Sequence, residues 1–273
     1  MKTARDWKAF YAREREALGE RGLAALFDRA PRVALPERGV AIFPHTRLEA
    51  SGELVAAAAR MAVESGRDEV LAIGVLHRSR GGEAPGPARG VHGPEVEDEE
   101  FSLDGFAVLL DVAARRAGRR PPRLLRRYPF LAGPEPATLP GLAELRAALA
   151  RGAALVATTD PIHHGAGYGT PPEKRIHRGG HAALDWALGE VERALDLLRG
   201  RDFGAFLRHC EEVRSDFRDV GPVLVELLDG GAGGAALEGR VVDLRLVDYS
   251  IALGADEPTW VAGALAVLQA TSA

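Results

Sequence analysis

The chain has 273 residues, of which 46% are hydrophobic and 27% charged, and its formal net charge is −4. This apolar content excludes an intrinsically disordered chain, and the single cysteine, Cys210, excludes a disulfide-stapled scaffold. No apolar run approaches the roughly 20 residues that a membrane span needs, and residues 1–30 are too charged for a secretory signal. We therefore expect a soluble cytoplasmic protein that contacts no membrane.

The first two-thirds of the chain alternates short apolar runs with helical periodicity. A charged amphipathic stretch at Arg5–Arg29 predicts an outer helix. The runs then predict strands, and the Ala/Leu/Arg-rich segments between them predict helices. The strands are expected at Gly39–Phe43, Val70–Leu76, Arg123–Arg127 and Ala153–Thr158, and the helices at Glu53–Glu64, Leu103–Ala117 and Leu142–Ala150.

The last third predicts longer helices and a final strand pair. Helices are expected at Ala182–Leu198, Phe203–Val213 and Asp219–Leu228, a strand at Arg240–Ser250, and a closing strand or helix at Trp260–Gln269. No composition break or repeat divides the chain. We expect one domain over residues 1–273, a three-layer α/β fold with a central mainly parallel or mixed sheet and helices on both faces.

Two Gly- and Pro-rich segments, Arg78–Glu100 and Pro161–Gly180, are long for connections and are expected to be loops with a function or without order. Histidines and an aspartate follow the predicted strands: His45, His77, and Asp160 with His163. Because the carboxyl ends of parallel strands face one crevice, these side chains should converge there. Two histidines and one carboxylate form the ligand set of non-haem Fe(II) oxygenases, although zinc accepts similar ligands. A third histidine beside them would act as acid or base, with Asp160 fixing its tautomer.

Short motifs at these strand ends and beyond also follow a recognisable order. They are FPHTRLEASG (43–52), GVLH (74–77), EFSLD (100–104), YPFLAG (128–133), TTDPIH (158–163), DYS (248–250) and WVAGAL (260–265). The series resembles that of the MEMO family, which shares its fold with class III (LigB-type) extradiol dioxygenases. The resemblance covers about Gly39 to Leu268, and residues 1–38 lie outside it as an N-terminal helical extension.

The resemblance implies that His45 and His77 bind a metal and that His163, beside Asp160, is the catalytic histidine. The chain departs from the family at the third ligand. MEMO proteins carry a cysteine there and the dioxygenases a glutamate, whereas strict counting here reaches Arg218, which cannot bind a metal. Asp219, one residue along, is the expected carboxylate ligand.

Other candidates remain open beside Asp219. Asp216 is an alternative ligand with a longer gap, and the two aspartates could instead form a helix capping box. Cys210 is too early in the chain to match the family's cysteine. Arg47, Arg78 and His164 are weaker candidates for substrate contacts, and both arginines could instead pair with nearby acidic residues.

The sequence argues against other classes of function. The arginines between 115 and 127 lack interleaved aromatic residues, so no nucleic-acid partner is expected. The chain has no P-loop and no Gly-x-Ser-x-Gly elbow. The leading hypothesis is an oxidoreductase that holds Fe(II), with copper or zinc as alternatives, and acts on a small aromatic or diol-like substrate with O₂. The alternatives are a catalytically degenerate module that binds a small anion or peptide, and a zinc-dependent hydrolase. Self-association into a homo-oligomer is compatible with the resemblance.

Overall fold

A computed structural model describes residues 3–77, 88–176, 180–230 and 234–271 of the chain. Its core is an eight-stranded sheet in the order β3-β4-β2-β5-β1-β8-β6, in which β7 also pairs with β8. The strands are β1 (Gly39–Phe43), β2 (Glu69–Ile73), β3 (Gly90–His92), β4 (Arg123–Phe130), β5 (Ala154–Thr158), β6 (Ile162–Gly165), β7 (Leu237–Asp248) and β8 (Thr259–Ala270). The α-helices are α1 (Ala4–Arg29), α2 (Leu48–Glu64), α3 (Asp104–Arg116), α4 (Leu142–Ala150), α5 (His181–Arg199), α6 (Phe203–Val213), α7 (Phe217–Leu228) and α8 (Ser250–Leu253).

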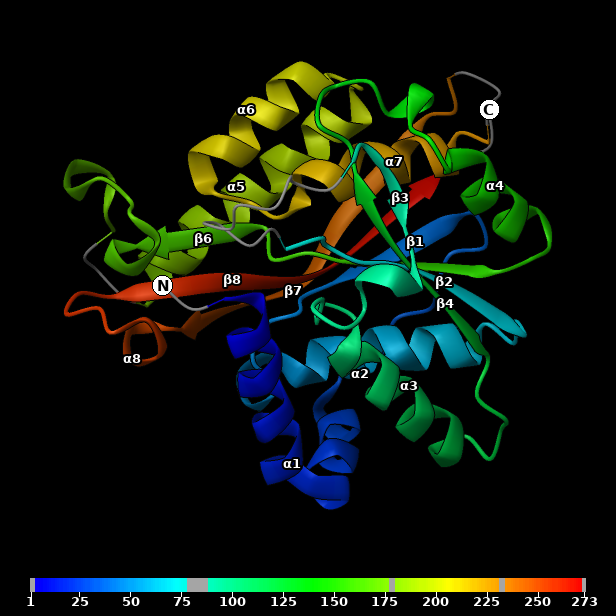
Figure 1. Cartoon of the computed structure of the whole chain (residues 1–273), viewed down its shortest axis with the longest axis horizontal. Helices are drawn as coiled ribbons and strands as arrows, with labels where there is room; N and C mark the ends of the chain where they lie inside the picture. Colours follow the sequence, from blue (N-terminus) through cyan, green and yellow to red (C-terminus); the bar gives the residue numbers. More distant parts are fainter. Residues whose placement is uncertain (1–2, 78–87, 177–179, 231–233, 272–273) are drawn as a thin grey trace.

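The sheet is mixed. Strands β4, β2, β5 and β1 run parallel to one another, whereas β3, β6, β7 and β8 make antiparallel pairs. Helices cover both faces: α1, α2 and α3 lie on one side and α4 to α7 on the other (Figure 1). The expectation of an α/β fold with a mixed sheet between two helical layers is therefore confirmed.

Alternate residues of each buried strand belong to the two layers. In β1, Ala41 and Phe43 pack with the core of α1–α3, while Val40 and Ile42 pack with the core of α4–α7. Because both faces are covered, these strands read as unbroken apolar runs, which is why their positions could be found in the sequence.

Strand β8 pairs with two strands, β1 and β6, which follow one another along the same edge of β8. Its residues 266–269 pair with β1 and its residues 259–262 pair with β6, while β7 occupies the opposite edge. The backbone between these two segments faces the turn after β1, since a Cβ on Gly263 would lie 2.9 Å from Pro44 Cβ. The carboxyl end of β1 and the start of β6 therefore meet at one point of the sheet.

Two local features differ from the sequence predictions. Strands β3 and β6 lie inside segments that were expected to be loops, whereas the closing element is a strand, one of the two forms expected for it. Helix α1 is interrupted at Gly19, whose φ of 58° and ψ of −178° are open to glycine but unfavourable for other residues.

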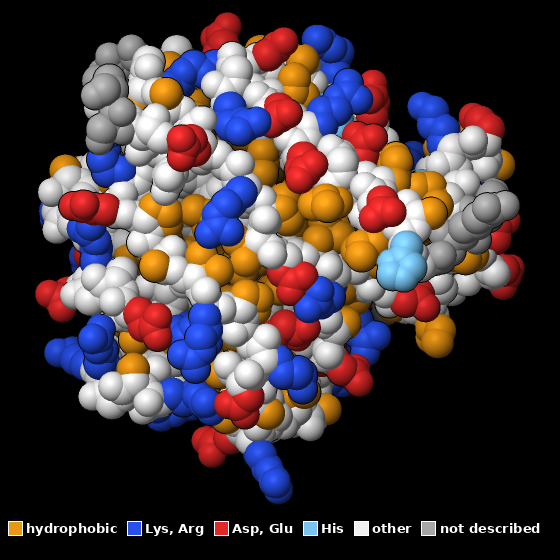
Figure 2. All heavy atoms as spheres, turned by 180° about the vertical axis from the view of Figure 1, so that it is seen from behind, with side chains coloured by type: hydrophobic (Ala, Val, Ile, Leu, Met, Phe, Trp, Pro, Cys, Tyr) orange, Lys and Arg blue, Asp and Glu red, His pale blue; other side chains and the backbone are white. Residues whose placement is uncertain are grey.

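The surface carries charges of both signs. Acidic and basic side chains are interspersed over the face seen in Figure 2. Four of the arginines between 115 and 127 form ion pairs, namely Arg116–Asp28, Arg123–Glu69, Arg126–Asp104 and Arg127–Glu144. Within the described part of the chain, no helix is both long and apolar enough to cross a membrane.

Candidate metal centre

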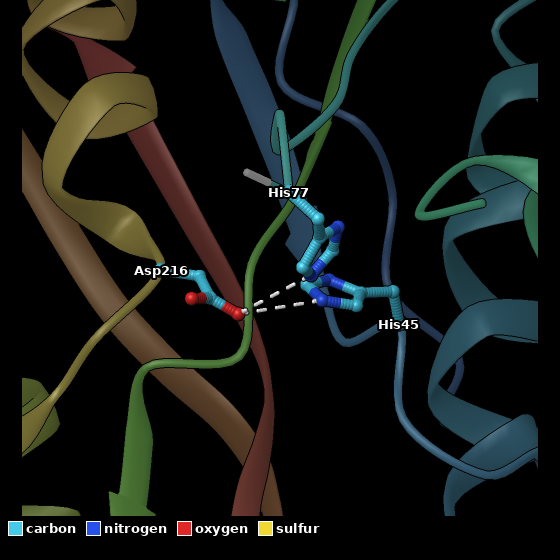
Figure 3. A group of neighbouring side chains, drawn as sticks. All are labelled: His45, His77 and Asp216. Carbon is cyan, nitrogen blue, oxygen red and sulfur yellow. Dashed lines mark ion pairs between the residues drawn. The ribbon is translucent and has the colours of Figure 1, made fainter. Parts of the chain in front are cut away.

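Side chains from four separate segments meet where β1 and β2 end. His45 and His77 follow β1 and β2, His163 lies in β6, and Asp160 precedes β6. Asp216 comes from the connection between α6 and α7, and its side chain points toward His45 and His77 (Figure 3). Two groups of possible metal ligands result, one of His45, His77 and Asp216 and one of Asp160, His163 and Asp216.

The environment of His45 fixes its tautomer. Its Nδ1 lies 3.3 Å from Thr158 Oγ1, and that hydroxyl donates its only hydrogen to the Phe43 carbonyl at 3.0 Å. Thr158 must therefore accept from a protonated Nδ1, which leaves the Nε2 lone pair of His45 free.

Glu100 fixes His77 in the same way. The Glu100 carboxylate lies 3.0 Å from His77 Nδ1 and accepts the His77 backbone amide at 2.6 Å. It also accepts the amides of Phe101 and Ser102, and it is buried. A carboxylate behind a histidine is the usual support of a metal-binding imidazole, and here it leaves Nε2 facing Asp216.

The third imidazole is held by a backbone carbonyl. His163 Nδ1 lies 2.7 Å from the carbonyl oxygen of Arg214. Since a carbonyl can only accept, Nδ1 carries the hydrogen and Nε2 is again the free nitrogen. Arg214 ends α6 in the left-handed conformation, with φ 55° and ψ 45°, and this turn directs its carbonyl at the histidine.

All three Nε2 atoms face one oxygen. Asp216 Oδ2 lies 3.5 Å from His45 Nε2, 3.8 Å from His77 Nε2 and 3.5 Å from His163 Nε2. These separations are too long for strong hydrogen bonds. Two ligands bound to one ion at about 2.1 Å lie roughly 3.0–3.5 Å apart. The separations from His45 and His163 reach the upper end of this range and that from His77 is slightly longer, so these residues could hold a metal ion.

The local backbone geometry lets the Asp216 side chain face the histidines. Asp216 is at the N-cap position of α7, but its side chain makes no capping hydrogen bond. Ser215 Oγ instead accepts the Phe217 amide at 3.0 Å, and the Asp216 amide donates to the Asp160 carbonyl at 3.2 Å. The capping box considered from the sequence does not form, and the Asp216 carboxylate is left for the histidines.

Asp219, the predicted third ligand, belongs to neither group. Its Oδ1 accepts the Leu131 amide at 2.9 Å, and its Oδ2 lies 3.9 Å from Arg218 Nε. The helical turn between residues 216 and 219 directs the two carboxylates to different partners. Counting positions along the sequence could not show which of the two faces the histidines. Asp216, the alternative, occupies the position expected for Asp219.

Asp160 is the second carboxylate of the site. Its Oδ1 accepts the His45 amide at 3.1 Å and its Oδ2 lies 3.5 Å from His45 Nε2. Burial raises its pKa above the ordinary value, although His45 and His163 oppose this rise. Burial also disfavours the charged form of Asp216, but the three histidines outweigh it and hold the pKa of that carboxyl well below its usual range.

The candidates for substrate contact lie elsewhere. Arg47 pairs with Glu14 and Glu49, at 3.3 and 2.6 Å. His164 points to the other side of β6 from His163, where its ring stacks on Trp260 and its Nε2 accepts the Ile176 amide. Both side chains are thus engaged in structural contacts. Arg78 lies outside the described residues.

Sequence reasoning assigned no role to Glu100. It ends an acidic run, EVEDEE, in which a buried carboxylate looks the same as its solvated neighbours. The signal was its place directly before Phe101 and Ser102, whose amides it accepts. The described residues show Phe101 stacked on His77, with ring centroids 4.3 Å apart.

Comparison with models of known protein families gives no match, and comparison with curated proteins gives none either.

Proposed function

We propose that this protein is a metal-dependent oxidoreductase similar to the MEMO and extradiol dioxygenase proteins. The observation that supports the proposal most is the convergence of three Nδ1-anchored histidines on the Asp216 carboxylate. His45, His77 and Asp216 would hold the ion, which we take to be Fe(II), and zinc and copper are compatible with the same donors. A bound Fe(II) with open positions would supply the means to bring a small aromatic diol and O₂ together.

His163 is suited to move a proton in that reaction. Its Nδ1 hydrogen is occupied by the Arg214 carbonyl, so Nε2 is the atom that can accept a proton from a substrate hydroxyl. Asp160 stands beside the same space, and its raised pKa favours a carboxyl that shares protons with its neighbours. The nearby Tyr168 ring, 4.8 Å from that of His163, restricts the side from which a substrate approaches.

The test is a metal analysis of matched variants. The protein is purified anaerobically, alongside His45→Ala, Asp216→Asn and, as control, Asp219→Asn. We expect about one iron per chain in the wild type and in Asp219→Asn, and its loss from the other two variants. Oxygen uptake with a panel of catechols, followed with an oxygen electrode, then tests the reaction.

Two outcomes would overturn the proposal. Zinc at full occupancy without oxygen uptake would indicate the hydrolase, which the same nitrogen and oxygen donors support. A wild-type protein that binds no metal, even after reconstitution with Fe(II), would indicate a module that binds a small anion or peptide without turnover.

A further inference from the structure

Helix α1 lies outside the family resemblance, yet it contacts both segments that carry the paired histidines. Its first part, before the interruption at Gly19, packs near the turn after His45 and the segment behind His77 (Figure 1).

Glu14 performs the capping that α2 lacks. The N-cap residue of α2, Arg47, gives no side-chain cap. Glu14 Oε2 instead accepts the Leu48 amide at 2.9 Å, and Oε1 lies 3.4 Å from the Glu49 amide and 3.3 Å from Arg47 Nε. The Glu14 carboxylate is only 9% exposed, so these are its main partners. A carboxylate at this helix end also complements the helix dipole. Glu14 therefore fixes the start of α2, three residues after His45.

Lys8 acts on the other histidine. Its ammonium donates to the Glu100 carbonyl at 3.0 Å and also to the Glu97 carbonyl. The Glu100 side chain is the group that orients His77. Tyr11, one helical turn further along α1, stacks on Phe101 with ring centroids 5.2 Å apart, and Phe101 stacks on His77.

We infer that Glu14 and Lys8 are positioning residues for two different members of the metal centre: Glu14 for His45 and Lys8 for His77. The inference concerns the same site as the proposed function and rests on that proposal, because the proposal is what makes the two histidines metal ligands. The contacts themselves exist without a metal, so the inference can be tested separately.

The experiment follows the ring ¹⁵N signals of His45 and His77 by NMR in protein treated with a chelator. We expect Glu14→Ala to shift and broaden the signals of His45 and leave those of His77 near their wild-type positions. Lys8→Met should do the reverse. Glu14→Gln, which keeps an acceptor for the Leu48 amide, should restore most of the His45 signal, and Glu16→Ala, at an exposed position of the same helix, should change neither histidine.

A second readout is the rate of metal loss to a chelator. Each positioning variant should lose metal about 10-fold faster than Glu16→Ala, as expected when the support of a ligand is removed.

Equal disturbance of both histidines by either variant would mean general loosening and would overturn the inference, as would no disturbance in either. If the wild type binds no metal while the crossed NMR pattern holds, the proposed function fails and the positioning roles stand. If Glu14→Ala does not fold, the same comparison is made between Glu14→Met and Glu16→Met, which remove the carboxylate and keep a long side chain.

Discussion

At the scale of single residues, the site depends on the hydrogen bond that each imidazole makes through its Nδ1 atom. A threonine hydroxyl, a glutamate and a backbone carbonyl each occupy an Nδ1, and the three Nε2 atoms turn to one carboxylate. A histidine without such a partner would distribute its hydrogen over both nitrogens. The three acceptors therefore orient the imidazoles in the protein without a metal.

The pair of His77 and Glu100 gives a pH dependence. Burial alone would lower the pKa of His77, but Glu100 and Asp216 outweigh it and raise it to about 10 from 6.5. Burial would raise the pKa of Glu100, but His77 and the local amides lower it to about 2 from 4.5. The stability that comes from His77 is therefore complete below pH 6.5 and is lost as the pH rises toward 10. The part that comes from Glu100 is complete above pH 4.5 and is lost as the pH falls toward 2.

We predict that the metal-free protein loses about 2–4 kcal/mol of unfolding free energy from this pair between pH 6.5 and 10. The measurement is denaturant unfolding with a chelator present at both pH values, for the wild type and His77→Gln. The variant should lack this loss, and His92→Gln, outside both ligand groups, should retain it. Parallel pH profiles for the wild type and His77→Gln would contradict the prediction.

The carboxylate that faces the histidines is the residue of the site that could not be predicted from the sequence. His45, His77, Asp160 and His163 were predicted from their places after apolar runs, and the structure brings them together with Asp216. The choice between Asp216 and Asp219 depends on the left-handed turn at Arg214 and the capping by Ser215. An arginine in that conformation leaves no signal in the sequence, because glycine is the residue expected there.

At the scale of elements, β8 brings His45 and His163 together, because it pairs with both β1 and β6. Its Gly263 lies between the segments that pair with β1 and β6. A Cβ there would be 2.9 Å from Pro44 Cβ and 2.9 Å from Thr46 Cγ2, on both sides of His45. We predict that Gly263→Ala costs about 1–3 kcal/mol by overpacking and weakens metal binding, as measured by unfolding and by isothermal titration with Fe(II) or Zn(II).

The matched control is another glycine with free space. Gly189 is exposed in α5, and nothing lies within 4 Å of a Cβ added there. Gly189→Ala should stabilise the protein by about 1 kcal/mol through helix propensity and leave metal affinity unchanged. Equal metal affinity in both alanine variants would show that Gly263 does not act through His45.

The elements missed by the sequence were the short ones. Strand β6 reads Ile-His-His-Gly and β3 reads Gly-Val-His, and neither has enough apolar residues to show a period. Both exist because a longer partner strand supplies their hydrogen bonds, β8 for β6 and β4 for β3. Long-range pairing of this kind is invisible to local patterns.

At the scale of the whole molecule, the ligands come from different parts of the fold. His45 and His77 follow strands of the sheet, whereas Asp216 belongs to the helical layer of α4–α7. An ion bound to all three would join that layer to the sheet, and binding to the folded state alone stabilises it. We predict that metal at 100-fold above its Kd adds about 2.7 kcal/mol. At roughly 2–4 °C per kcal/mol for a chain of this size, this raises Tm by several degrees.

Differential scanning calorimetry with metal and with chelator checks this effect. Asp219→Asn keeps an oxygen that can accept the Leu131 amide and should show the same shift as the wild type, whereas Asp216→Asn should show none. A shift that survives in Asp216→Asn would place the ion at other residues.

The junction of β1 and β6 along β8 has a consequence for related sequences. Successive residues of a strand point to opposite sides, and His163 is followed by a second histidine that packs against Trp260. A one-residue insertion in the link 159–161 would slide β6 by one position and exchange the two imidazoles. The number of residues in that short link therefore decides which of two neighbouring histidines faces Asp216, and a chain with a link of another length would present a different imidazole there on an unchanged scaffold.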